Sequence, residues 1–143
     1  MKANIMVVDD ERTIRVPLKM ILTEEGYETQ AASNGKEALE LIEEHDFDIM
    51  ITDLKMPEMD GMELVRHCQR ICPQTSIIII TAYGSLESAI EALRMGAYDY
   101  ILKPFDFDDV LIKIRRLIKQ KQLIRENQAL KMQTDQTHTF GNI

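Results

Sequence analysis

Residues 77–81 read Ile-Ile-Ile-Ile-Thr, a run of four β-branched apolar side chains that ends on a hydroxyl group. A short run that is apolar on both faces is typical of a buried central strand in a parallel sheet. Three other apolar runs also end on polar residues: 5–11 on Asp-Asp-Glu, 49–53 on Thr-Asp, and 100–104 on Lys-Pro. Helical patterns separate these runs, so the sequence predicts strands that alternate with helices around a parallel sheet.

The alternation continues from the N-terminus to about residue 119. The expected strands are 4–8, 27–31, 48–52, 76–80 and 97–102. Three of the expected helices cover 12–24, 62–71 and 85–95. A further helix, between the second and third strands, is expected to be capped by Ser33 or Asn34, and the last helix is expected to start at residue 106 or 107. This order predicts the α/β class, as a doubly wound five-stranded parallel sheet with five helices on its two faces. Pro17 predicts an irregular or late start of the first helix.

Length and composition limit the possible functions. The 143 residues suit one domain with a sizeable core. Acidic residues outnumber basic residues by 24 to 17, and the formal charge of -7 argues against direct nucleic-acid binding through a general basic surface. No run approaches the roughly 18 apolar residues of a membrane span. The start of the chain lacks the apolar region of a signal peptide. We therefore expect a cytoplasmic protein with no membrane association.

Cys68 and Cys72 lie four residues apart in a predicted helix, with His67 beside them. A partial metal or redox site is one interpretation. Structural zinc sites need four ligands, however, and the sequence offers no second cysteine pair. We therefore expect two small side chains that pack on one helix face.

The carboxyl ends of parallel strands share one edge of a sheet, which is where open α/β sheets bind ligands. That edge is predicted to gather Asp9, Asp10, Asp53, Thr81 and Lys103. Clustered carboxylates repel one another unless a cation compensates them, and Mg²⁺ prefers such oxygen ligands. A carboxylate can then attack phosphorus, while a Lys and a Thr hydroxyl bind the oxygens of the transferring group. Any one of these residues has an ordinary structural explanation, but together they predict phosphoryl chemistry.

These motifs resemble the receiver domain of two-component response regulators, over about residues 5–119. The matching segments are Val8-Asp9-Asp10-Glu11, Thr52-Asp53-Leu54-Lys55-Met56-Pro57-Glu58-Met59-Asp60-Gly61, Thr81-Ala82, and Tyr98-Asp99-Tyr100-Ile101-Leu102-Lys103-Pro104-Phe105. The resemblance implies a flavodoxin-like sheet with strand order 2-1-3-4-5. It also implies a signalling switch that accepts a phosphoryl group from a sensor histidine kinase. Such a switch assists its own phosphorylation and dephosphorylation but is not otherwise an enzyme.

The resemblance assigns roles to the acidic residues. It makes Asp53 the phosphoacceptor and Asp10 a direct Mg²⁺ ligand, with Asp9 acting through water. Asp53 and the backbone carbonyl of Lys55 complete the expected metal site.

It also assigns roles on the last two strands. Thr81 and Lys103 are expected to bind the phosphoryl oxygens, and Tyr100 is the expected switch aromatic, whose ring turns inward when Thr81 moves. The Lys103–Pro104 bond is expected to be cis, a state that only X-Pro bonds reach at modest cost. Tyr83, two residues after Thr81, is expected to hinder the attacking water and lengthen the phosphate lifetime.

Residues 84–92, 96–100 and 123–130 resemble the nitrogen-regulator class of response regulators. In that class a receiver precedes an ATPase that activates sigma-54 polymerase, and a DNA-binding helix-turn-helix follows. No P-loop motif occurs in this chain. We therefore expect the receiver part of a longer transcription regulator, with a stand-alone receiver as the alternative.

The expected domain organisation has three parts. A receiver domain covers 1–119, a helical extension covers 120–133, and a flexible tail covers 134–143 and leads toward an output domain. Leu123, Asn127 and Leu130 are spaced four and three apart, which fits a short coiled-coil seam and a homodimer. The alternative is an amphipathic tail that folds back on its own domain.

A phosphohydrolase with an aspartyl-phosphate intermediate is the competing function. Such enzymes usually need a second acid shortly after the nucleophile, and Lys55 occupies the position two after Asp53. A receiver that binds partners without phosphorylation is a further alternative, against which the complete set of Asp, Thr and Lys side chains argues.

Overall fold

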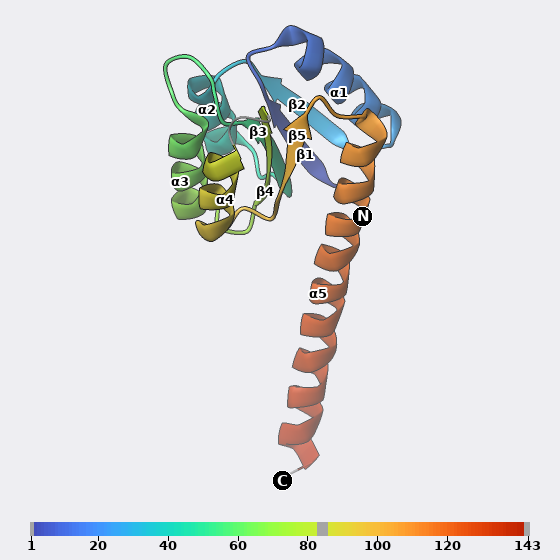
Figure 1. Cartoon of the computed structure of the whole chain (residues 1–143). Coiled ribbons are helices and arrows are strands. Elements are labelled where there is room, and N and C mark those ends of the chain that lie inside the picture. Colours follow the sequence, from blue (N-terminus) through green and yellow to red (C-terminus); the bar gives the residue numbers. More distant parts are fainter. Residues whose placement is uncertain (1, 83–85, 142–143) are drawn as a thin grey trace. The chain divides into compact units, whose positions relative to one another are not determined.

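A computed structural model describes residues 2–82 and 86–141 of the chain (Figure 1). The described part forms five strands and five helices in strict alternation. In chain order they are β1 (Asn4–Val8), α1 (Arg12–Glu24), β2 (Glu28–Ala32), α2 (Gly35–Glu44), β3 (Ile49–Asp53), α3 (Gly61–Ile71), β4 (Ser76–Ala82), α4 (Leu86–Arg94), β5 (Asp99–Lys103) and α5 (Phe107–Gly141). The predicted α/β class and element order are confirmed.

All neighbouring strands pair in parallel, in the order β2-β1-β3-β4-β5. This is the order that the resemblance implied, and it makes β2 an edge strand, which agrees with its partly polar sequence. The register aligns Val8 of β1 with Thr52 of β3, and Asp53 of β3 with Ile80 of β4. The polar residues that follow these strands therefore come out at one edge of the sheet.

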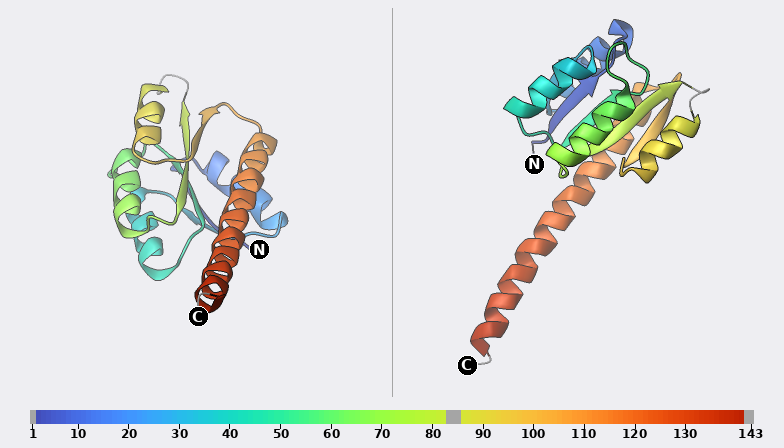
Figure 2. Two further views of the ribbon diagram at one scale, coloured as in Figure 1. Left: turned by 90° about the horizontal axis from the view of Figure 1, so that it is seen from below. Right: turned by 90° about the vertical axis from the view of Figure 1, so that its left-hand side faces the viewer.

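The chain divides into two compact units, Lys2–Phe107 and the segment from Asp108 onward. Within the first unit, α2, α3 and α4 cover one face of the sheet and α1 covers the other (Figure 2). Alternate residues of the central strands, such as Met50, Ile77 and Ile79, are buried in one cluster with residues of α2, α3 and α4. Isoleucines therefore occupy successive positions of β4 because both faces of that strand are covered.

Cys68 and Cys72 belong to this buried cluster, and both are free thiols. Their Sγ atoms lie 3.0 Å apart. Burial raises the pKa of the Cys68 thiol, as does its hydrogen bond with Cys72, and both effects favour the neutral form. The expectation of two small packed side chains is therefore confirmed.

The predicted irregular or late start of α1 is wrong. The helix begins at Arg12, and the amides of Ile14 and Arg15 donate to the carbonyl of Glu11. Pro17 costs a helix interior about 3 kcal/mol. Burial of the Leu18 and Leu22 side chains on the same helix offsets this cost, at roughly 1.5–3 kcal/mol each.

Helix α5 is longer than predicted. It runs from Phe107 to Gly141, through a segment that was expected to be flexible from residue 134. No Pro or Gly interrupts residues 107–140, so no residue type in this segment ends the helix before Gly141. The predicted inward-facing residues of its first turns are all buried, namely Val110, Leu111, Ile114, Leu117 and Ile118. The boundaries between receiver, extension and tail stay predictions. Among the described residues, no helix is long and apolar enough to cross a membrane.

Glycines begin both α2 and α3, and each approaches a neighbouring segment closely. A Cβ atom on Gly61 would collide with backbone atoms of Asp53 and Leu54. A Cβ atom on Gly35 would lie 2.8–2.9 Å from side-chain atoms of Met59. We expect Gly61→Ala to lower the free energy of unfolding by about 1–3 kcal/mol, as overpacking against rigid backbone does. Gly35→Ala should cost less, because the flexible Met59 side chain can move.

Urea unfolding of both variants, followed by circular dichroism, tests this comparison. The two substitutions are matched, since both add one methyl group at the first residue of a helix. The prediction would be contradicted if Gly35→Ala lowered the free energy of unfolding as much as Gly61→Ala, or more.

Candidate functional site

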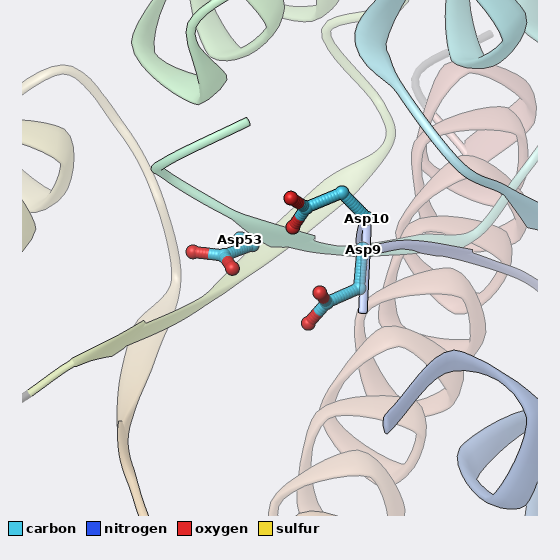
Figure 3. Close-up of side chains that lie close together, drawn as sticks. All are labelled: Asp9, Asp10 and Asp53. Carbon is cyan, nitrogen blue, oxygen red and sulfur yellow. The ribbon is translucent and has the colours of Figure 1, made fainter. Parts of the chain in front are cut away.

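Acidic and basic side chains from three strands meet at the carboxyl edge of the sheet. Asp9 and Asp10 follow β1, Asp53 is the last residue of β3, and Lys103 is the last residue of β5. Figure 3 shows the three aspartates side by side, two from the end of β1 and one from the end of β3. One carboxylate oxygen from each lies within 4.8 Å of the other two. The topology therefore brings together side chains that lie more than 40 residues apart in the sequence.

Lys103 joins this cluster to a fourth carboxylate. Its Nζ atom donates a hydrogen bond to Asp53 Oδ2 at 2.9 Å and to Glu11 Oε1 at 3.2 Å. It also lies 3.3 Å from Asp9 Oδ2. Glu11 was not among the predicted site residues. The signal that could have identified it was its position directly after the two aspartates.

Backbone amides hold the other oxygens of the two buried aspartates. The amide of Glu11 donates to Asp9 Oδ1 at 2.9 Å, and the amide of Lys55 donates to Asp53 Oδ1 at 3.1 Å. These bonds leave the Oδ2 atom of each carboxylate facing Lys103. The loop after β3 thus brings the Lys55 amide to Asp53, and the metal-ligand role expected of the Lys55 carbonyl stays a prediction.

The electrostatics of the cluster reflect burial of like charges. Asp9 is 1% exposed. Burial raises its pKa to about 6, helped by the charge of Asp53, although the Glu11 amide and Lys103 both act to lower it. For Lys103, burial acts to lower the pKa of the ammonium group. The hydrogen bond to Asp53 and the negative charge of Asp53 raise this pKa, as do the charge of Asp9 and the hydrogen bond to Glu11, and the overall effect is a raised pKa. Lys103 is therefore held as a cation among carboxylates.

Two buried polar atoms have no hydrogen-bond partner in the part of the chain that the structure describes. They are Asp9 Oδ2, which lies within ion-pair range of Lys103 but outside hydrogen-bond geometry, and Thr81 Oγ1. A buried polar group without a hydrogen bond costs about 1–3 kcal/mol. A hard cation beside Asp9 and an oxygen-rich ligand beside Thr81 would satisfy both atoms. The donor set of three carboxylates also fits Mg²⁺, which takes oxygen ligands.

The other predicted site residues lie on β4, on β5 or outside the described part of the chain. Thr81 is buried on β4, one residue beyond the strand partner of Asp53. Tyr100 on β5 is half-buried and packs against the core cluster. The Lys103–Pro104 bond is cis, as the resemblance implied. Tyr83 lies outside the described residues, as does Ser85, where the fourth helix was expected to begin.

Residues 5–115 match the family described as response regulator receiver domain. The chain belongs to this family. The receiver fold that the sequence motifs predicted is therefore established, and the acidic cluster lies within the matched segment.

Curated relatives of this receiver domain are regulatory proteins. It is 35% identical over 139 residues to the regulatory protein AtoC of Escherichia coli, an alignment that covers 97% of this chain and 30% of AtoC. It is 40% identical over 124 residues to the response regulator protein PilR of Pseudomonas aeruginosa, covering 87% of this chain and 27% of PilR. The chain thus spans about a third or less of these relatives.

Solved structures agree with this assignment. A receiver domain protein from Clostridium thermocellum matches with a TM-score of 0.79 and 39% identity, covering 85% of this chain and 98% of that one. NtrX from Brucella abortus matches with a TM-score of 0.85 and 34% identity, covering 91% of this chain and 30% of NtrX.

The raised pKa of Asp9 makes the stability of the metal-free receiver depend on pH. The folded state keeps a proton on Asp9 that the unfolded state releases, so this stabilisation is complete below pH 3.8 and is lost as the pH rises through about 6. The difference corresponds to roughly 3 kcal/mol at most. We expect the free energy of unfolding of the wild type to fall across this range relative to that of Asp9→Asn.

Urea titrations in the presence of a chelator, at several pH values from about 3.5 to about 7, cover the whole shift from 3.8 to about 6 and measure this difference. The same pH dependence in the wild type and in Asp9→Asn would show that Asp9 does not carry it.

Proposed function

We propose that this receiver domain is a phosphorylation-activated switch of a two-component system, which accepts a phosphoryl group on Asp53 from a sensor histidine kinase. The observation that carries the proposal is the position of Asp53, which belongs to the acidic cluster with Asp9 and Asp10 and also contacts a lysine. Its Oδ2 atom lies 2.9 Å from Lys103 Nζ. A carboxylate held in this way is suited to act as a nucleophile toward a phosphorus atom.

Asp9, Asp10 and Asp53, with the carbonyl of Lys55, are the residues that would hold Mg²⁺. When bound, Mg²⁺ supplies positive charge that offsets the negative charge of the transferring phosphoryl group. An Asp53 oxygen attacks the phosphorus, and the bond from phosphorus to the donor histidine nitrogen breaks. The Lys103 ammonium and the Thr81 hydroxyl bind the phosphoryl oxygens. The hydroxyl is available for this because Thr81 Oγ1 has no hydrogen-bond partner among the described residues.

The output is a population shift between two surface states. Thr81 moves toward the phosphoryl group, Tyr100 follows, and the surface formed by α4 and β5 changes. Some active form therefore exists without phosphate. The relatives that the chain matches over a third or less of their length include the transcriptional regulatory protein ZraR of Klebsiella oxytoca and the DNA-binding transcriptional regulator NtrC of Proteus hauseri. In a cytoplasmic regulator of the sigma-54 class, the switch would control such an output domain.

Phosphorylation can be tested directly. Incubation with acetyl phosphate and Mg²⁺, followed by mass spectrometry of the intact protein, should give a single phosphate adduct in the wild type. Asp53→Asn should give none, because an amide does not attack phosphorus under these conditions. Omission of Mg²⁺ should also prevent adduct formation.

Asp46→Asn is the matched control, since it makes the same chemical change at an exposed aspartate just after α2. It should be labelled like the wild type. Absence of an adduct in the wild type, when a known receiver is labelled in parallel, would favour a binding module that works without phosphorylation. Rapid turnover of small phosphomonoesters would instead support the phosphohydrolase.

Dimerisation through α5 is the second part of the proposal. The helix is continuous past residue 130, and Leu123 and Leu130 are 49% and 60% exposed. These two residues flank Asn127 in the predicted seam. We expect Leu123→Glu combined with Leu130→Glu to shift the receiver toward monomer, as measured by size-exclusion chromatography with light scattering.

Gln122→Glu combined with Gln128→Glu adds the same charge to the same helix at positions off the seam, and it should leave the dimer intact. Equal effects of the two pairs would indicate general charge repulsion. A monomeric wild type, with and without phosphorylation, would contradict dimerisation of this chain.

A further inference from the structure

The Glu11 side chain contacts Lys103 and does not cap the helix that begins beside it. Glu11 is the N-cap residue of α1, yet its side chain forms no capping hydrogen bond. Ser, Thr, Asp or Asn would stabilise this helix start better, because their short side chains reach the free amides of the first turn. The longer Glu11 side chain extends to Lys103, 92 residues later in the sequence, and accepts a hydrogen bond of 3.2 Å from its Nζ atom.

The three carboxylates around Lys103 differ in exposure. The side chains of Asp9 and Asp53 are 1% and 7% exposed, whereas that of Glu11 is 52% exposed. The Lys103 ammonium therefore contacts two buried acids and one half-exposed acid. It can keep one ionic partner while its contacts with the other two weaken.

Lys103 and a divalent cation would share the carboxylates of Asp9 and Asp53. The ammonium is 2.9 Å from Asp53 Oδ2 and 3.3 Å from Asp9 Oδ2, and both residues belong to the acidic cluster that fits Mg²⁺. Two cations on one pair of carboxylates repel each other. Binding of the second cation is therefore easier if the ammonium has another carboxylate to contact.

We propose that Glu11 is a positioning residue that draws the Lys103 ammonium away from Asp9 and Asp53 and so makes room for Mg²⁺. This inference rests on the proposed function, because it assumes that the acidic cluster binds Mg²⁺. It assigns to a side chain outside the metal site a defined effect on metal affinity. The effect acts through Lys103, so it should disappear when Lys103 is replaced.

Isothermal titration calorimetry with Mg²⁺ on four proteins tests this coupling: wild type, Glu11→Gln, Lys103→Gln and the double variant. Contacts of a half-exposed ion pair are modest, so we expect Glu11→Gln to weaken Mg²⁺ binding by up to about fivefold. In the Lys103→Gln background the same substitution should change the dissociation constant by less than about twofold. Equal effects in the two backgrounds would overturn the inference, because Glu11 would then act only by its charge.

Two control variants sharpen the comparison. Glu24→Gln removes the same charge from the last residue of the same helix and should leave Mg²⁺ affinity unchanged. Glu11→Asp keeps the charge but shortens the side chain by one methylene group. It should weaken Mg²⁺ binding as Glu11→Gln does, and full wild-type affinity in Glu11→Asp would overturn the inference.

The Lys103 ammonium can also be observed without metal, by nitrogen-edited NMR of the lysine side chains. The Glu11→Gln substitution should shift the Lys103 signal, whereas the Glu24→Gln substitution should leave it unchanged. This readout does not depend on the stability of Lys103→Gln, and an unshifted Lys103 signal would overturn the contact itself. Failure of the proposed function would look different, since the wild type would then give no heat of Mg²⁺ binding and no phosphate adduct on Asp53.

Discussion

The structure of the site depends on one electrostatic constraint: several carboxylates are gathered at the edge of the sheet, and one lysine compensates them. Asp9 and Asp53 are almost fully buried, and the Lys103 ammonium contacts both of them. Burial of unpaired charge costs far more than a typical hydrogen bond returns. The Lys103 ammonium therefore stabilises the ionised form of the two buried acids, and a further cation or anion that enters the site would change this balance.

The backbone of the fold positions these charges. Parallel pairing brings the ends of β1, β3, β4 and β5 to one edge, and amides of the following loops hold the Oδ1 atoms of Asp9 and Asp53. Gly61 allows α3 to begin in direct contact with the backbone of Asp53 and Leu54. The Asp53 carboxylate is thus positioned by its strand, by the loop after it and by the start of the next helix, while Thr81 Oγ1 has no hydrogen-bond partner among the described residues.

Much of this arrangement could be predicted from residue patterns. The isoleucine run of β4 indicated a strand covered on both faces, and the alternation of apolar runs with helical periods indicated a doubly wound sheet. The contact between Glu11 and Lys103 could not be predicted, because it joins side chains 92 residues apart and depends on the direction of a flexible side chain. The length of α5 was also missed, since a polar sequence without Pro or Gly neither requires a helix nor ends one.

The sequence by itself determined the α/β class, the family and the set of residues at the strand ends, because local periodicity and short motifs carry that information. Only the tertiary structure decided which oxygens face Lys103, that Asp9 Oδ2 and Thr81 Oγ1 have no hydrogen-bond partner among the described residues, and that Glu11 joins the cluster. Hydrogen-bond geometry and burial arise from packing between distant segments. Their effects on charge, including the raised pKa of Asp9, therefore appear only when the sheet has formed.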